Sequence, residues 1–185
     1  PQTASLEAYT RPEILSADLS SFMLDLAQWG VSDPGKLAFL DPPPRAALAE
    51  AKTLLAELGA IDSDGRITEE GRKLRALPLP PRLARMVVDA AAEGAGELAA
   101  GIAAVVTERG LGGDDVDLRH RLDNFRRDRS KRADDARAMV RRWAETAGGK
   151  AAASEHSPGS LLALALIQMH RPTRLIEVRP LRVRS

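Results

Sequence analysis

A basic stretch with the sequence "RHRLDNFRRDRSKR", residues 119–132, carries the clearest potential for chemistry in this chain. Arginine and lysine neutralise phosphates without reading a base sequence, so a run of them predicts binding to a polyanion. Phe125, among these arginines, could in addition stack on a base. The alternative is a solvated helix whose arginines pair with nearby acids, namely Asp123, Asp128, Asp134 and Asp135. We expect His120 to be a surface residue.

The charge of the chain is unevenly distributed, although its formal net value is only +1. Residues 1–118 hold 11 basic and 19 acidic side chains, a net charge of −8. Residues 119–142 hold 10 basic and 4 acidic side chains, a net charge of +6, and residues 171–185 hold 5 and 1, a net charge of +4. A polyanion is therefore expected to meet the later half of the chain.

No other group of residues predicts catalysis or a metal site. The absence of cysteine excludes disulfides, thiolate catalysis and cysteine-bound zinc. The histidines lack the spacing of a helical metal pair: His120, His156 and His170. Ser157 and Ser160 lie near His156 in a glycine-proline loop without an oriented acid, which argues against a hydrolase triad. Asp62 and Asp64 suit a turn better than a calcium loop.

The composition predicts a mainly α fold. The chain of 185 residues is 44% hydrophobic and 29% charged, and aromatics reach only 3% because alanine and leucine supply most of the apolar side chains. No run approaches the roughly 20 apolar residues of a membrane span, and Pro1 opens no signal-peptide pattern. We expect a cytoplasmic protein, and the missing start methionine suggests a fragment of a longer gene product.

Residues 11–78 predict a winged-helix domain. A first helix is capped by Thr10 and ends at Gly30, with one apolar face: Leu19, Phe22, Met23, Leu26 and Trp29. Asp33 and Asp41 each precede a proline, as helix N-caps do. The helix at 43–58 has a buried stripe: Leu48, Ala51, Leu54, Leu55 and Leu58. Asp-Gly between short apolar segments at 60–68 predicts a small β-hairpin, and Thr68 caps another short helix.

The remaining chain predicts a helical bundle at residues 79–170. "LPLPP" at 77–81 resists helix formation and predicts a stiff joint. Helices follow at 81–94 and 95–110, and the second is apolar on nearly every side and hence central. After a loop at 110–117, the helix at 134–149 places Ala136, Met139, Val140 and Trp143 on one side. A linker at 150–160 and a short last helix at 160–170 complete the bundle.

Three segments of the sequence resemble a known family. "RITEEGRKLRALPLPPRLARMV" is similar to the segment that joins the winged helix to the ratchet domain in DEAH-box helicases. "WGVSDPGKLAFLDPPP" and "LGAIDSDGRITEEGR" resemble the bacterial HrpB branch of that family. The likeness runs from about Arg11 to about Leu164. Pro80 departs from the family pattern, which has an acid or histidine there, and predicts a stiffer joint.

The resemblance implies an accessory fragment of an ATP-dependent RNA or DNA helicase. Members couple ATP hydrolysis to movement along a single strand through two RecA-like motor domains, and residues 1–10 would be the end of such a domain or a linker. The chain has no GxxxxGK[ST] loop and no D-E-x-H motif, so we expect it to lack ATPase activity alone, with ATP and Mg²⁺ bound by the parent helicase. It would pack on the motor domains and guide single-stranded nucleic acid.

In similar helicases a ratchet-domain helix lines the path of the single strand. Charge, not motif identity, selects the candidate nucleic-acid-binding residues here: Arg126, Arg127, Lys131, Arg132, Arg137 and Arg141. Two other functions stay open. A free-standing winged helix could bind duplex DNA through residues 43–58, although these lie in the acidic part of the chain. A protein-interaction module would instead direct the basic segment to an acidic partner.

The end of the chain departs from the family. Relatives continue after "LLALA" with an aromatic-Pro-Asp segment, whereas this chain reads "LIQMHRPTRLIEVRP". We hypothesise a single-base frameshift near Leu166, which would make residues 171–185 an atypical basic tail. Sequencing the source DNA across this region tests the hypothesis.

Overall fold

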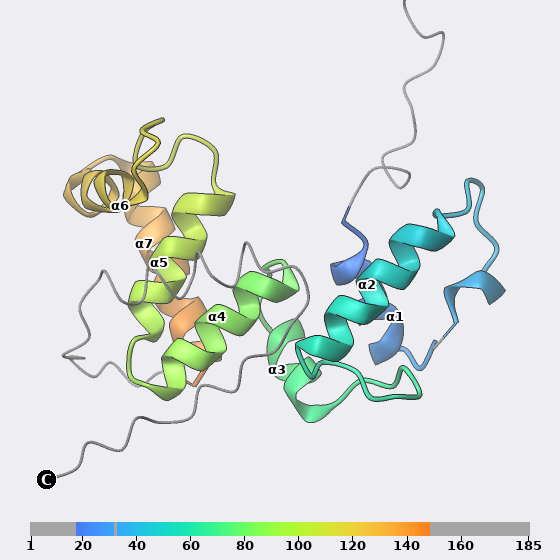
Figure 1. The fold of residues 1–185 in the computed structure, drawn as a ribbon. Helices are drawn as coiled ribbons and strands as arrows, with labels where there is room; N and C mark the ends of the chain where they lie inside the picture. The colour runs from blue at the N-terminus through green and yellow to red at the C-terminus, as the bar shows by residue number, and fades with distance from the viewer. Residues whose placement is uncertain (1–17, 32, 149–185) are drawn as a thin grey trace, which may run out of the picture. The chain divides into compact units, whose positions relative to one another are not determined.

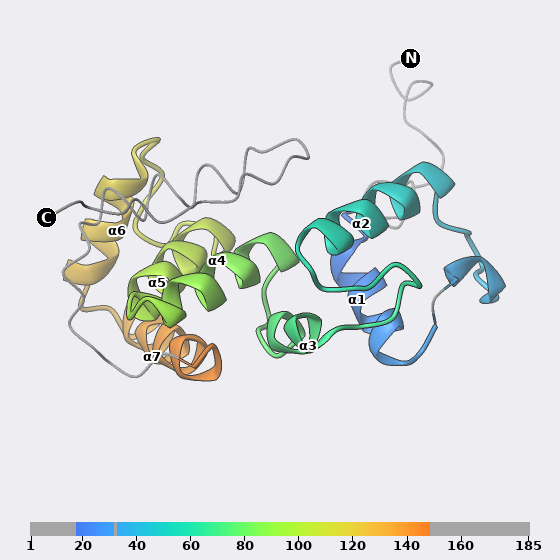
Figure 2. The same cartoon turned by 60° about the horizontal axis from the view of Figure 1, so that its bottom comes forward.

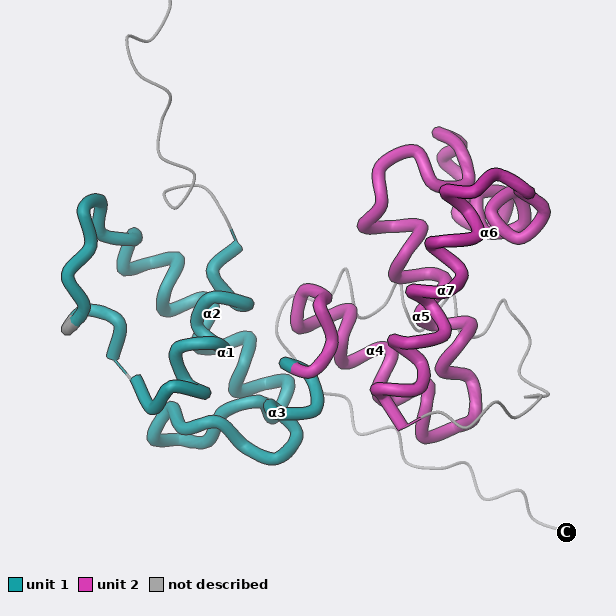
Figure 3. The backbone as a smooth tube through the Cα atoms, turned by 180° about the vertical axis from the view of Figure 1, so that it is seen from behind, with its two compact units in different colours: residues 1–75 teal, residues 76–185 magenta. Residues whose placement is uncertain are grey.

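The chain is helical and divides into two compact units (Figure 3). The computed structural model describes residues 18–31 and 33–148. These residues form seven α-helices and one 3-10 helix, so the predicted mainly α fold is confirmed. The units divide between Arg75 and Ala76. None of the helices in these ranges has the length and apolar character needed to cross a membrane.

Unit 1 is built on helix α1, which packs against both α2 and α3 (Figure 1). The helices span Ser20–Gln28, Arg45–Glu57 and Glu69–Arg75 respectively. The predicted apolar stripes supply the core, whose buried side chains include Met23, Leu26, Leu54, Leu55 and Leu74. Burial of these faces, at roughly 1.5 to 3 kcal/mol per large aliphatic side chain, is what holds such short helices together.

Trp29 was predicted on the buried face of the first helix, and this prediction is wrong. The helix α1 ends at Gln28, and Gly30 at φ +80 turns the chain away from the helical path. The Trp29 side chain is consequently 69% exposed. The predicted start of this helix at Thr10 lies outside the described residues.

Only one of the two predicted Asp-Pro caps forms. The Asp33 carboxylate accepts a hydrogen bond from the Gly35 amide at 3.0 Å and begins the short 3-10 helix η3, Pro34–Lys36. Asp41 does not cap α2, which begins at Arg45 after Pro44 at φ −59 and ψ 131. Each proline in the run at 42–44 disfavours the helical conformation for the residue before it, so the helix starts later than predicted.

The predicted β-hairpin at residues 60–68 is not seen as two strands. A single antiparallel bridge joins Ile61 and Ile67, the only β-pairing found in the described ranges. The Asp62 carboxylate accepts from the amides of Asp64 and Arg66, each at 2.9 Å, and so closes the turn with its own side chain. The Thr68 amide still donates to the Ala60 carbonyl at 3.0 Å, but its hydroxyl caps α3 by accepting from the Gly71 amide at 3.0 Å. Because α3 begins at Glu69, no residue is left for a second pair of strand residues.

Unit 2 places the most apolar helix at its centre (Figure 2). The helix α5, Gly96–Thr107, packs against α4, Pro81–Ala92; α6, Leu118–Arg127; and α7, Lys131–Thr146. Small side chains at Ala99, Ala100, Ala103 and Ala104 are buried, which lets the neighbouring helices approach closely. Pro81 occupies the first turn of α4, where a missing amide costs nothing.

The predicted apolar side of the last described helix is confirmed. Ala136, Val140 and Trp143 of α7 are buried, and Met139 is half-buried. Several predictions lie outside the described residues: the segment 1–10, the linker at 150–160, the short helix at 160–170 and the basic tail at 171–185.

Candidate nucleic-acid interface

The basic segment at residues 119–132 forms the helix α6 and the turn that follows it. The Asp117 carboxylate caps the helix by accepting from the Arg119 amide at 2.8 Å. Leu122 and Phe125 are buried and fix which side of α6 faces the bundle. Arg126 and Arg127 are left in the last turn, where a positive charge interacts favourably with the helix dipole.

The chain then turns sharply into α7 through a pair of capping residues. The Asp128 carboxylate accepts from the Ser130 amide at 2.8 Å, and this bond holds the pKa of Asp128 below its usual range. The Ser130 hydroxyl in turn accepts from the Ala133 amide at 3.2 Å and caps α7. We call residues 126–132 the α6–α7 corner. It holds five basic residues and one acidic residue, and all seven of its residues are exposed.

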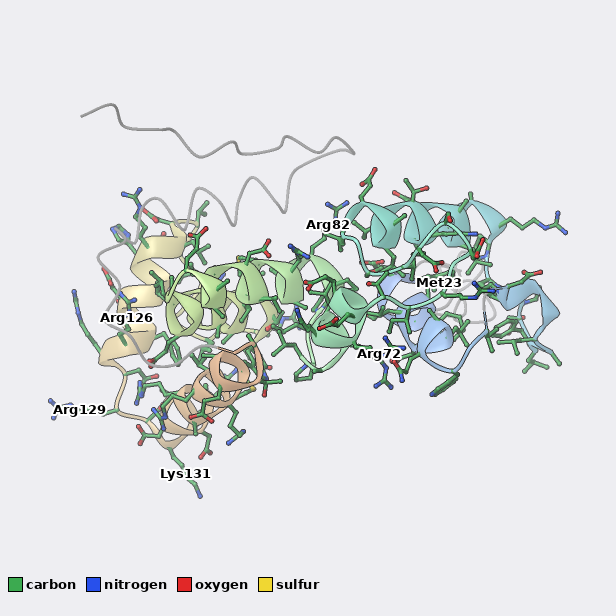
Figure 4. The ribbon with its side chains drawn as sticks, turned by 90° about the horizontal axis from the view of Figure 1, so that it is seen from below. Met23, Arg72, Arg82, Arg126, Arg129 and Lys131 are labelled. Carbon is green, nitrogen blue, oxygen red and sulfur yellow. The ribbon has the colours of Figure 1, made fainter. Side chains whose placement is uncertain are left out.

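Four of the six predicted binding residues keep their charged groups available to solvent. Arg127, Lys131 and Arg141 are exposed and make no hydrogen bond or ion pair with any residue the structure describes. Arg126 is half-exposed, and its guanidinium lies 3.7 Å from Asp123, a surface pair that contributes little energy. Figure 4 shows Arg126 and Lys131 at the same end of unit 2.

The other two predicted residues bind the protein's own backbone. The Arg132 Nη2 donates to the carbonyl of Arg109 at 2.5 Å, which ties the loop between α5 and α6 to α7. The Arg137 Nη1 donates to the carbonyl of Phe125 at 2.8 Å, one of the terminal carbonyls that α6 cannot satisfy itself. Arg137 also pairs with Asp134 at 2.5 Å and lies over the Phe125 ring, 5.8 Å from its centroid.

The predicted stacking role of Phe125 is wrong. Its ring is only 3% exposed and is covered by Arg137, so no base can reach its face. The spacing of Leu118, Leu122 and Phe125 along one helical face was the sequence signal for this burial. The predicted alternative pairing of the arginines is seen for Asp123 and Asp134.

Two further side chains attach the loop between α5 and α6 to the interface. The Arg121 Nη2 donates to the carbonyls of Val105 at 2.5 Å and Leu111 at 3.3 Å, while its buried Nε has no partner in the described part of the chain. Asn124 donates to the Gly112 carbonyl at 3.3 Å. These hydrogen bonds from side chains to backbone carbonyls hold the loop in position without an ion pair to an acidic side chain.

The same loop carries a histidine–carboxylate pair at its end. His120 is exposed, as predicted, and its Nδ1 lies 3.0 Å from the Asp115 carboxylate. This hydrogen bond raises the pKa of His120. The pKa of Asp115 is lowered, first by the hydrogen bond that the Asp117 amide donates to its carboxylate and then by the bond with His120.

Sequence reasoning missed Arg129 as a candidate. It lies between the two helices, is exposed, and extends away from both of them (Figure 4). The signal was present in "RRDRSKR", because Asp128 and Ser130 are typical capping residues and mark a turn on which Arg129 must project. Arg142 was missed as well and is exposed on α7.

The described residues outside the corner offer little alternative chemistry. The helix α2 exposes Arg45 and Lys52, but also the acidic Glu50, so it is a poor surface for phosphates. No group of three or more histidine, aspartate or glutamate side chains in the described ranges could hold a metal ion. His156, His170, Ser157 and Ser160 lie outside those ranges.

Comparison with known proteins identifies the region. Residues 53–79 match the sequence model of the helicase associated domain (HA2), winged-helix. The ATP-dependent RNA helicase HrpB of Escherichia coli K12 is 43% identical over 107 residues, which is 58% of this chain and 13% of that protein. The ATP-dependent RNA helicase HrpA of the same organism is 38% identical over 91 residues, 46% of this chain and 7% of that protein.

Solved structures agree with the sequence matches. The crystal structure of the E. coli DExH-box NTPase HrpB matches with a TM-score of 0.66 and 33% identity, covering 90% of this chain and 19% of that one. A second crystal structure, of the Escherichia coli DEAH/RHA helicase HrpB, also gives a TM-score of 0.66 and 33% identity, over 87% of this chain and 19% of that one. The sequence and structure matches all support a helicase-associated (HA2) region like that of DEAH-box helicases. The likeness is to the bacterial HrpB type.

Proposed function

We propose that this chain is the accessory part of an ATP-dependent helicase, where it packs on the motor domains and guides a single strand of RNA or DNA. The observation that carries the proposal is the α6–α7 corner, which holds five basic residues and one acidic residue on an exposed turn. In the proposal ATP and Mg²⁺ bind the RecA-like domains of the parent protein, and this chain supplies binding surface only.

The positive charge of the α6–α7 corner supports a contact of modest strength with the phosphate backbone of a nucleic acid. Each phosphate of a single strand that a cation neutralises adds about 0.7 to the slope of log affinity against log salt concentration. Four of the six predicted binding residues keep their charged groups available to solvent, so the slope of log affinity against log salt concentration should be about −3. Because Phe125 is buried, the corner offers no aromatic face on which bases could stack, so we expect weak binding without preference for base sequence.

Exposed apolar side chains support packing on the motor domains. In unit 1, Trp29 is 69% exposed and Leu40 is 99% exposed, so each offers apolar surface whose burial against another domain would be favourable. The chain spans only 13% of the length of its HrpB relative, so most of such a protein is available to cover them. Serine at both positions should leave the melting temperature of this chain unchanged and lower that of a longer parent polypeptide with its motor domains.

A matched control separates packing from a general loss of apolar surface. Val116 in unit 2 is fully exposed, and Val116→Ser should change neither melting temperature. If serine at Trp29 and Leu40 leaves the parent polypeptide as stable as before, the packing part of the proposal is wrong.

Fluorescence anisotropy across a salt series tests the nucleic-acid part of the proposal. The chain should bind labelled single-stranded RNA or DNA weakly, with an affinity that falls about 50-fold between 50 mM and 200 mM salt. Tight binding to duplex DNA would instead favour a winged-helix regulator. Absence of any salt-sensitive binding would favour a protein-interaction module.

A further inference from the structure

Six basic residues in or beside the α6–α7 corner divide into two groups that a charge count cannot separate. One group has its cationic heads in solvent: Arg126, Arg127, Arg129 and Lys131. The other group, Arg132 and Arg137, donates to backbone carbonyls of neighbouring elements. A guanidinium whose donors are committed to carbonyls has fewer left for a phosphate, so the two groups cannot do the same work.

We propose that Arg129 is a direct phosphate contact of the α6–α7 corner, and that Arg132 and Arg137 are positioning residues that hold the corner in place. The inference rests on the proposed function, since it assigns residues to the same strand-binding surface. It adds Arg129 to the phosphate contacts, and it removes Arg132 and Arg137, which charge alone would select as contacts.

Arg129 is suited to contact because of where the turn places it. The hydrogen bonds of Asp128 with Ser130 and of Ser130 with Ala133 fix the backbone on both sides of Arg129. Its side chain lies beyond the ends of both helices and has no hydrogen bond or ion pair with any described residue. The fixed backbone and free guanidinium let it bind a phosphate while the protein loses little additional backbone entropy.

Arg137 and Arg132 are suited to positioning because each joins two elements. Arg137 bridges α7 to the carbonyl of Phe125 in the last turn of α6, at 2.8 Å, and its side chain is only 26% exposed. Arg132 joins the start of α7 to the Arg109 carbonyl at 2.5 Å. Loss of either hydrogen bond should make one end of the α6–α7 corner more mobile. Nucleic-acid binding should then weaken because the contact residues are less ordered, and not because a phosphate contact is lost.

The two roles predict different pairs of measurements. Arg129→Gln should reduce the salt slope for a single-stranded oligouridylate by about 0.7 and leave the melting temperature unchanged. Arg132→Gln and Arg137→Lys should lower the melting temperature and weaken binding at every salt concentration while the slope stays near that of the unaltered chain. Arg137→Lys keeps the charge but loses the forked geometry, so it distinguishes geometry from charge.

Arg72 provides a matched control. It is an exposed arginine on α3 in unit 1, and Arg72→Gln should change neither the slope nor the melting temperature. The inference is overturned if Arg129→Gln leaves the slope unchanged, or if Arg137→Lys binds as tightly as the unaltered chain. Loss of slope in Arg132→Gln without a change in melting temperature would make Arg132 a contact and also overturn the assignment. If the unaltered chain shows no salt-dependent binding, the proposed function itself fails.

Discussion

Gly71 offers a quantitative test of the packing in unit 1. A Cβ atom built at Gly71 would lie 2.1 Å from the Ala60 carbonyl oxygen and 2.8 Å from Cγ1 of Ile67. Contacts between carbon and oxygen usually lie at about 3.3 Å or more, so the turn at 60–68 and α3 would have to separate by about 1 Å. The Ala60 carbonyl already accepts from the Thr68 amide at 3.0 Å, which ties this oxygen to the cap of α3.

The expected cost of Gly71→Ala follows from two opposing terms. Overpacking costs about 1 to 3 kcal/mol, and we take the upper end because the obstructing atom is backbone and not a flexible side-chain tip. Alanine in place of glycine inside a helix returns about 1 kcal/mol. The net loss is about 2 kcal/mol, which lowers the melting temperature of a unit of this size by about 8 to 16 °C.

Gly101 is the matched control for this substitution. It is also a buried helical glycine, but a Cβ there would meet only Cδ1 of Leu122, at an ordinary contact distance of 3.6 Å. Gly101→Ala should therefore raise stability by up to about 1 kcal/mol. Thermal unfolding followed by circular dichroism measures the stability of both variants. Hydrogen exchange shows whether the change in Gly71→Ala is confined to residues 58–75. A Gly71→Ala variant as stable as the Gly101→Ala variant would refute the close approach of α3 to the turn.

Two further predictions concern the loop between α5 and α6. Gly112→Ala should destabilise unit 2 in urea unfolding, because Gly112 has φ +74 and a Cβ there would lie 2.1 Å from the Arg121 carbonyl oxygen; unchanged stability would contradict this geometry. The His120 ring should titrate by NMR above its ordinary pKa of 6.5, and Asp115→Asn should bring the midpoint down. Since the folded-state pKa of His120 is raised, its stabilising bond is complete below pH 6.5 and is lost as the pH rises through the folded-state value. An unchanged titration midpoint of His120 in Asp115→Asn would contradict the hydrogen bond between these two side chains.

Helix identity could be predicted from the sequence because apolar periodicity and capping residues are local. The stripe of Leu54 and Leu55 and the central place of α5 follow from such patterns. The exposure of Trp29 could not be predicted from periodicity, because one residue decides whether a side chain is the last of a helix or the first beyond it. The hairpin was predicted too long because the cap of α3 occupies the residues that a second strand would need.

The candidate site was only partly predictable for a different reason. Charge density located the basic segment, but it could not separate Arg129, which faces solvent, from Arg132 and Arg137, which donate to carbonyls. Those carbonyls belong to Arg109 and Phe125, and their approach to α7 depends on the packing of the helices. Partners that are brought together by tertiary structure leave no trace in the order of charges along the chain.

An NMR titration of the ¹⁵N-labelled chain with an unlabelled single-stranded oligonucleotide would locate the nucleic-acid contact residue by residue, because each backbone amide reports its own surroundings. We expect the largest, salt-sensitive chemical-shift changes at residues 126–132, while the amide signals of α2 at 45–57 keep their positions. Shifts concentrated in α2, with residues 126–132 unaffected, would contradict this expectation.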